Sequence, residues 1–278
     1  MSHPPTARAV IAVMLLAAAV SLQAAEPSFR APFDGHLSGA DVPAAEIAFG
    51  DGIAGQAAVV GATQDGEFRC TWDATDCISA EQGAVSLWVQ PIDWDGDDPD
   101  HQIFFSATGE DAVLHVYRYQ DVGAQSGYSR KLLFLYGPSQ RDEDGDWQWT
   151  IASADEPKAW ERGRWHHIAC TWDGGEMRLY LDGKVANTRA TQAPPATTFE
   201  TFGAGGTYSW QKTGGTTLID ELKLFTEPLT AAEVYVEWER HGEATGDEAG
   251  EFGVDYVYTD IETQTVHLGL SQPFPLWK

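Results

Sequence analysis

Apolar and polar residues alternate along nearly every segment of this chain that is longer than a loop, and this period of two constrains the fold more than any other feature. Examples are AVSLWVQ at 84–90, VLHVYRY at 113–119 and KLLFLY at 131–136. Such alternation is typical of half-buried antiparallel strands. Because the segments are short and separated by loops rich in Gly, Asp and Ser, they predict a β-sandwich or barrel. Further strands are expected at 102–106, 147–153, 166–172, 177–181, 184–189 and 217–225.

One helix is expected near the C-terminal end of the body. Thr230 and Glu233 have the spacing of a capping box, residues 231–240 are mostly helix formers, and Gly242 marks the end. An acidic, Gly-containing linker at 242–253 follows. The remaining stretch, 254–278, is a strand-like tail that is too short to fold alone, so docking on the body, pairing with a partner and mobility all stay open.

The N-terminus has the pattern of an export signal. Arg8 precedes an apolar run at 9–20 and small residues at 21–25, which predicts a signal peptide over 1–25, cleaved after Ala24 or Ala25. An apolar run of about a dozen residues is too short for a permanent membrane span. We therefore expect a secreted or periplasmic protein without membrane insertion, and one folded body over 26–241.

The charge balance narrows the range of partners. Seventeen basic residues face 42 acidic ones, a formal net charge of −25. Such a field repels phosphate backbones and anionic lipid, which argues against nucleic-acid and membrane-surface binding. It favours divalent cations or neutral ligands, although for most of the acidic residues solubility is a sufficient explanation.

Three cysteines imply at least one unpaired thiol. In an oxidising compartment Cys70 and Cys77 could close a small disulfide loop. Cys170 lies in an alternating apolar segment and is interpreted as a buried free thiol. A bridge from Cys170 to either of the others remains an alternative.

Four stretches carry a resemblance to a known family: WHHIACTWDGGEMRLYLDG at 165–183, FDGHLSG at 33–39, GAVSLWVQP at 83–91 and IDELKLFTEPLTAAEV at 219–234. Together they resemble the laminin-G-like jelly rolls of the concanavalin A-like lectin and glucanase superfamily. The resemblance implies an all-β, antiparallel jelly-roll sandwich over 26–241, with one short C-terminal helix and a strand-like tail. It does not fix the function, since this fold hosts lectin-like modules, adhesion modules, hydrolases and lyases.

The resemblance also implies a structural calcium ion between the first strand's turn and the last strand, which here points to Asp34 and Asp220. The alternative for Asp220 is a residue that caps backbone amides. Two acidic loops, 93–100 and 142–146, place carboxylates at alternate positions as calcium loops do. For each of these loops a solvated acidic turn is the preferred interpretation.

Aromatic side chains are the candidate ligand contacts. Trp147 and Trp149 are predicted to share one face of a strand, with Tyr117 and Tyr119 on another strand and Trp94 beside a polar loop. Exposed rings of this kind can stack on the apolar face of a sugar. The alternative is that several of these rings pack beneath loops.

No catalytic residue is predicted. A glycoside hydrolase needs two carboxylates across a cleft, and the E-x-D-x-x-E strand of the laminarinase relatives is missing. The Arg, Gln, His and Tyr set of jelly-roll lyases has only a weak match at His101 and Gln102. We therefore expect an exported, non-catalytic module that binds carbohydrate or another cell-surface ligand. A polysaccharide-active hydrolase or lyase and a protein-binding adhesion module are the alternatives.

Overall fold

The structure is a computed structural model that describes residues 25–37, 39–41, 47–63, 66–123, 126–195, 197–206, 214–242, 253–260 and 265–271. Its elements are β1 (Phe29–Ala31), β2 (Phe49–Asp51), β3 (Gln56–Thr63), β4 (Gly66–Asp73), β5 (Gly83–Pro91), β6 (Gln102–Gly109), β7 (Ala112–Arg118), β8 (Leu132–Gly137), β9 (Thr150–Ala154), the 3₁₀ turn η2 (Glu156–Ala159), β10 (His166–Trp172), β11 (Glu176–Leu181), β12 (Lys184–Ala190), β13 (Thr201–Gly205), β14 (Gly215–Phe225), α1 (Ala231–Gly242), β15 (Gly253–Asp260) and β16 (Thr265–Ser271). Within these ranges no helix is both long enough and apolar enough to cross a membrane.

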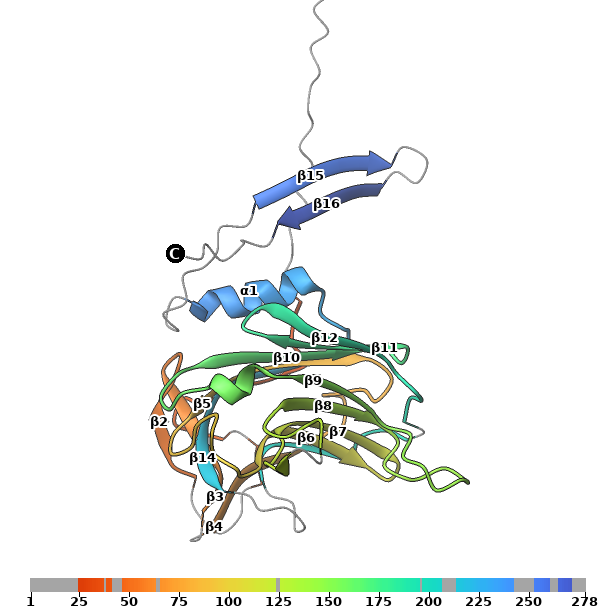
Figure 1. The fold of residues 1–278 in the computed structure, drawn as a ribbon. Coiled ribbons are helices and arrows are strands. Elements are labelled where there is room, and N and C mark those ends of the chain that lie inside the picture. Colours follow the sequence, from red (N-terminus) through yellow and green to blue (C-terminus); the bar gives the residue numbers. More distant parts are fainter. Residues whose placement is uncertain are drawn as a thin grey trace, which may run out of the picture.

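The strands form two antiparallel sheets, which confirms the predicted jelly-roll sandwich (Figure 1). Sheet A has the order β12-β11-β10-β5-β14-β3, with β1 beside β14 and β2 beside β3. Sheet B has the order β4-β13-β6-β7-β8-β9. The hairpin of β3 and β4 carries the chain from one sheet to the other. Alternate residues of both sheets fill one large core between the layers, as their period of two requires.

The strands expected at 166–172, 177–181 and 184–189 form as predicted and make up the meander of β10, β11 and β12. Ile168 pairs with Leu181 and Trp172 with Met177 across the first hairpin. The second hairpin turns at Asp182 and Gly183, whose φ angles of 47° and 74° are left-handed. Asp-Gly tolerates this conformation, which is the reason that the dipeptide marks tight hairpin turns.

Helix α1 covers the outer face of sheet A. The predicted capping box is present, because Thr230 N–H donates to Glu233 Oε2 at 2.8 Å and Glu233 N–H donates to Thr230 Oγ1 at 3.3 Å. Trp238 of the helix packs with Trp88, Trp165 and other apolar residues of the sheet. The outer face of sheet B is not covered by α1 and is therefore the face to search for a ligand site.

Five strands, namely β1, β2, β3, β4 and β13, and the arrangement of the tail were not foreseen. β3 and β13 are rich in Ala and Gly, and no strand was expected at the position of β4. β9 begins at Thr150, three residues after the predicted start. The strand-like tail contains two strands, β15 and β16, which pair with each other in antiparallel register; the signal peptide and most of the linker lie outside the described residues.

All three cysteines are free thiols, so the predicted bridge between Cys70 and Cys77 is wrong. Cys70 faces the core from β4 and is fully buried, whereas Cys77 lies half-buried in the turn after that strand. β4 continues for three residues beyond Cys70, which at the usual strand rise adds about 10 Å before the turn. A disulfide requires Cα atoms within about 7 Å of each other. Cys170 is a buried free thiol, as predicted.

Candidate functional site

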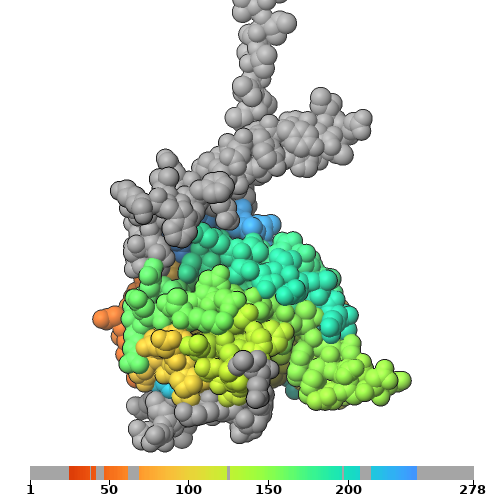
Figure 2. Space-filling model, viewed as in Figure 1, coloured from red at the N-terminus to blue at the C-terminus, as the bar shows by residue number. Residues whose placement is uncertain are grey.

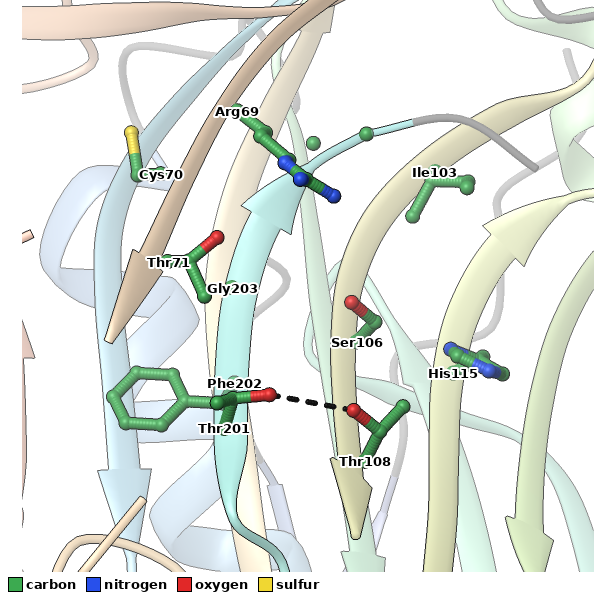
Figure 3. Close-up of a pocket in the computed structure, with 12 residues that line it drawn as sticks. Arg69, Cys70, Thr71, Ile103, Ser106, Thr108, His115, Thr201, Phe202 and Gly203 are labelled. Carbon is green, nitrogen blue, oxygen red and sulfur yellow. Dashed lines mark hydrogen bonds between the residues drawn. The ribbon is translucent and has the colours of Figure 1, made fainter. Parts of the chain in front are cut away.

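A polar groove of about 200 Å³ crosses the outer face of sheet B (Figure 3). Four hydroxyl side chains line it, together with Arg69 of β4 and His115 of β7. The hydroxyls belong to Thr71, Ser106, Thr108 and Thr201. Thr108 and Thr201 face each other across β6 and β13 with their Oγ1 atoms 3.3 Å apart. The groove therefore presents several hydrogen-bonding groups on a surface that is not covered by the helix.

Glycines in β13 create the hollow. Gly203 lies between Thr71 of β4 and Ser106 of β6 in the register, and Gly205 follows two residues later on the same face. Their neighbours Phe202 and Ala204 point into the core instead. Since the two outward positions carry no side chain, the floor of the groove is backbone, and an added Cβ at Gly203 would come within 2.5 Å of the Cys70 carbonyl.

An aromatic cluster continues from the groove across β7, β8 and β9. Tyr117 and Tyr119 pack with Trp149 and with Ile103, which also lines the groove. The rings of Tyr117 and Tyr119 are 6.3 Å apart, so both lie on the predicted face. However, Tyr117 is only 6% exposed, and burial raises the pKa of its phenol. Tyr117 thus supports this face from beneath and does not offer an open ring.

Trp147 and Trp149 lie in the connection that precedes β9. Their rings stack at 4.0 Å with an angle of 10° between the planes. Trp147 is 39% exposed, Trp149 is partly buried, and the guanidinium of Arg141 lies 4.3 Å above the ring of Trp147. The hairpin that carries this pair projects from the body as the lime-green extension in Figure 2. A ligand that stacked on Trp147 would have to share the ring with these two neighbours.

Trp94 is not a surface contact, and that prediction is wrong. Its side chain is fully buried and lies 6.2 Å from Phe104 and from Trp160, measured between ring centroids. Its Nε1–H donates to Thr217 Oγ1 at 2.9 Å. The polar neighbours of Trp94 in sequence suggested exposure, but the loop turns this indole inward.

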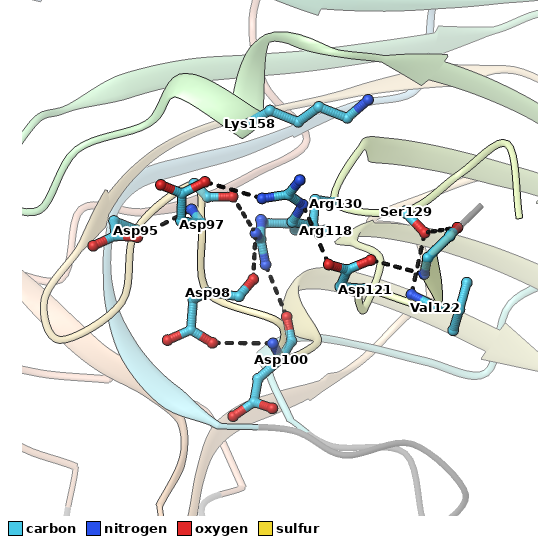
Figure 4. A network of polar contacts seen from close by, with 12 residues as sticks. Asp95, Asp97, Asp98, Asp100, Arg118, Asp121, Val122, Ser129, Arg130 and Lys158 are labelled. Atoms are coloured by element: carbon cyan, nitrogen blue, oxygen red, sulfur yellow. Dashed lines mark hydrogen bonds and ion pairs between the residues drawn. The ribbon is translucent and has the colours of Figure 1, made fainter.

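The acidic loop at 93–100 is organised by a guanidinium group. Arg118 of β7 is fully buried, and its Nη atoms donate to the carbonyl oxygens of Gly96, Asp98 and Asp100 at 2.8, 2.6 and 2.9 Å (Figure 4). Burial lowers the pKa of Arg118 to about 10, which leaves it charged at neutral pH. A side chain thus supplies the positive charge that these carbonyls surround.

Asp34 and Asp220, the predicted calcium ligands, lie against the same turn between β2 and β3. Asp34 Oδ1 accepts the N–H of Gln56, and Asp220 Oδ2 accepts the N–H of Ala54, each at 3.1 Å. Asp220 is fully buried, and this burial raises the pKa of its carboxyl to about 7. Both interpretations of Asp220 thus have support, since it caps amides and also lies in the predicted place beside the first turn.

Two carboxylates approach this turn, and carboxylate oxygens are ligands that calcium takes. Calcium takes six to eight oxygen ligands in most protein sites, and two carboxylates supply the charged ones. Among the described residues no group of three or more His, Cys, Asp and Glu side chains could hold a metal. Further ligands would therefore have to be backbone carbonyls or water.

Sequence reasoning missed most of the groove. Arg69 and Thr71 alternate with core residues in β4, and Ser106 and Thr108 do the same in β6, so the pattern was visible. Their proximity depends on β13, a Gly-containing strand that carries little periodic signal.

These features define a two-layer, antiparallel β-sandwich with one open, grooved face. A family model described as the concanavalin A-like lectin/glucanases superfamily matches residues 68–235, and the chain belongs to this superfamily. No curated protein matches the chain in sequence.

Solved structures share the fold. Domain 4 of the extracellular arabinanase AbnA from Geobacillus stearothermophilus, in complex with arabinotriose, is 21% identical, with a TM-score of 0.56 over 77% of this chain and 98% of that domain. The binding domain of botulinum neurotoxin DC in complex with SialylT is 11% identical, with a TM-score of 0.52 over 73% of this chain and 47% of that one. A botulinum neurotoxin type C structure, titled for its interaction with two ganglioside molecules, is 11% identical, with a TM-score of 0.55 over 84% and 57%. The chain spans about half the length of these neurotoxin structures, and at such identities the likeness shows the fold alone.

Proposed function

We propose that this chain is an exported, non-catalytic glycan-binding module that holds a sugar chain on the outer face of sheet B. The observation that carries the proposal is the groove itself, because hydroxyl, guanidinium and imidazole groups converge there on a face that α1 leaves open. A small number of convergent polar groups is what orients and selects a ligand in a binding site. Burial lowers the pKa of His115 to about 3, so its imidazole is neutral at physiological pH and serves as a hydrogen-bonding group.

The arrangement of the strands suits an extended ligand. The groove centres on β13, and four strand spacings separate β13 from β9 in the sheet order. At the usual spacing this is about 19 Å, which leads from the hydroxyl groups toward the Trp147 and Trp149 stack beside β9. A sugar chain that follows this direction would meet polar groups first and an aromatic edge second, a combination that suits sugars, which have both polar and apolar faces.

Two structural neighbours support a carbohydrate ligand, since the arabinanase domain binds arabinotriose and the type C neurotoxin interacts with two ganglioside molecules. Binding is favoured over hydrolysis because the described residues that line the groove include no carboxylate, whereas glycosidases use two. Export rests on the predicted signal peptide.

A glycan array probed with the mature chain tests the proposal. Trp147→Ala should weaken binding of any retained glycan by about tenfold, since one stacked ring is worth roughly 1 to 2 kcal/mol. It should leave the fold intact, because Trp147 is exposed. Ile92, also exposed at 38% but part of neither the groove nor the aromatic cluster beside it, provides the matched control as Ile92→Ala. Absence of binding to every glycan on the array would refute the proposal.

The structural calcium ion is part of the same proposal. Asp34 and Asp220 would hold it, and the ion would tie the first turn to the last strand of the body. Ligands that bind only the folded state raise its stability by mass action, so millimolar calcium should raise the melting temperature of the wild type. Asp220→Asn should remove most of that response. A melting curve that does not move with calcium or with chelator would disprove a calcium site.

A further inference from the structure

The groove on sheet B differs in charge from the rest of the molecule. Acidic residues make up 42 of the 278 positions and outnumber basic ones by more than two to one. Yet none of the described residues that line the groove is acidic, and one of them is Arg69. The described lining of the groove is thus neutral to slightly positive in a chain of net charge −25, so net charge alone does not decide the charge of the ligand.

The surroundings of Arg69 are suited to an oxyanion. Its side chain is exposed on β4 and extends over the groove toward β6 (Figure 3). Thr71 follows it on the same face of β4, and Ser106 of β6 lies across the Gly203 floor. A guanidinium presents a planar fork that matches two oxygens of a carboxylate or sulfate, and hydroxyl groups can donate to the same oxygens.

One carboxylate lies at the rim of this hollow. The β-bridge between Asp41 and Thr71 places Asp41 directly opposite a groove residue, and such opposed residues share a face of the sheet. An anionic ligand has to approach against the charge of Asp41. Removal of the Arg69 charge should therefore weaken the binding of an anionic ligand, whereas removal of the Asp41 charge should strengthen it.

We propose that the groove selects anionic glycans, with Arg69 binding a carboxylate or sulfate group of the sugar while Thr71 and Ser106 hydrogen-bond to its oxygens. This inference rests on the proposed glycan-binding function and adds the charge class of the ligand. In this proposal the selectivity comes from the guanidinium of Arg69, which explains how so acidic a chain can hold an acidic sugar.

The test uses the full mature chain on an array of uronate-bearing, sialylated, sulfated and neutral glycans. Oligogalacturonates and their methyl esters are included because the two share a backbone and differ in the free carboxylate. We expect acidic glycans to dominate the bound set. The comparison of uronates or sialylated glycans with sulfated ones then identifies which oxyanion is preferred.

Variants assign the selectivity to Arg69. Arg69→Gln should weaken the binding of acidic glycans by about ten- to a hundredfold, which is the usual contribution of a charged hydrogen bond. The binding of neutral glycans should not change. Arg69→Lys should fall between, since the charge remains but the fork is lost. Asp41→Asn should strengthen the binding of acidic glycans. Arg189→Gln makes an equal charge change on the exposed edge strand β12. It should change the affinity for acidic glycans only by the small amount that any variant of the same net charge shows.

The possible failures are distinguishable. If neutral glycans bind and Arg69→Gln behaves as Arg189→Gln does, the charge inference is wrong while the glycan-binding function stands. If the wild-type chain gives a cooperative melting curve but binds no glycan of any charge, both the charge inference and the glycan-binding function are wrong. If acidic glycans bind but Asp41→Asn and Arg69→Gln leave them unchanged, the anion lies elsewhere and the inference is also refuted.

Discussion

Removal of the Arg118 guanidinium should destabilise the protein by about 3–5 kcal/mol, because a buried positive charge holds the 93–100 loop. Its three hydrogen bonds to carbonyl oxygens measure 2.6–2.9 Å. At about 1.5 kcal/mol each they give about 4.5 kcal/mol. The guanidinium also lies 5.4 Å from the ring of Trp94, a cation–π contact worth about 1 kcal/mol. Relaxation of the loop into water offsets part of the total.

Arg118→Met preserves much of the side-chain volume and removes the charge, and urea unfolding followed by tryptophan fluorescence measures the cost. Arg118→Lys should lose about half as much stability. The charge remains, but a single ammonium group cannot reach all three carbonyls as the planar guanidinium does. Arg189→Met on exposed β12 is the control and should change stability by less than about 0.5 kcal/mol. A loss below about 1 kcal/mol for Arg118→Met would refute the reasoning.

Two further predictions concern stability. Lys223 of β14 is 3% exposed and bonds Glu237 of α1 at 2.7 Å and Glu221 at 3.0 Å; Lys223→Met should cost about 3–5 kcal/mol because two carboxylates then lose their buried partner. Added Glu237→Gln should recover part of this loss, and a double mutant no more stable than Lys223→Met would contradict the buried-charge explanation. Burial lowers the pKa of His167 to about 3 from its ordinary 6.5, so the unfolded state binds more protons between these values. Stability should therefore be full above pH 6.5 and fall by at most about 1.4 kcal/mol per pH unit below it for this one residue. His167→Gln should reduce the slope of unfolding free energy against pH, and an unchanged slope would exclude His167 as a source.

Much of the fold was predictable because its signals are local. The period of two in 84–90 or 166–172 indicates a strand whatever the strand pairs with, and the Thr230–Glu233 capping box fixes the start of α1 within one turn. Strands without such a signal were missed. β13 is the clearest case, since its sequence TFGAG has few residues that favour strands, and only its neighbours β4 and β6 hold it extended.

The site was predicted less well than the fold. The rings of Trp147 and Trp149 stack on each other, but both residues precede the strand on which they were placed. Tyr117 and Tyr119 lie close to each other, although Tyr117 is buried. The prediction for Trp94 was wrong because the exposure of its side chain depends on where the loop turns. Arg118, more than 20 residues away, determines that turn. Asp34 and Asp220 were paired through a family resemblance and share the β2–β3 turn, while the ion they would hold stays a proposal.

The sequence by itself determined the all-β class, the central meander and the single helix, because each follows from neighbouring residues and their periodicity. Only the tertiary structure decided where the groove lies. Arg69, Ser106, His115 and Gly203 come from four strands spread over more than 130 positions, and no local preference brings them together. The order of strands in sheet B does so, because the cost of closing such long loops is repaid only when both sheets bury their shared core. The groove is therefore a consequence of that packing, and its charge is set by which few side chains the packing leaves facing outward.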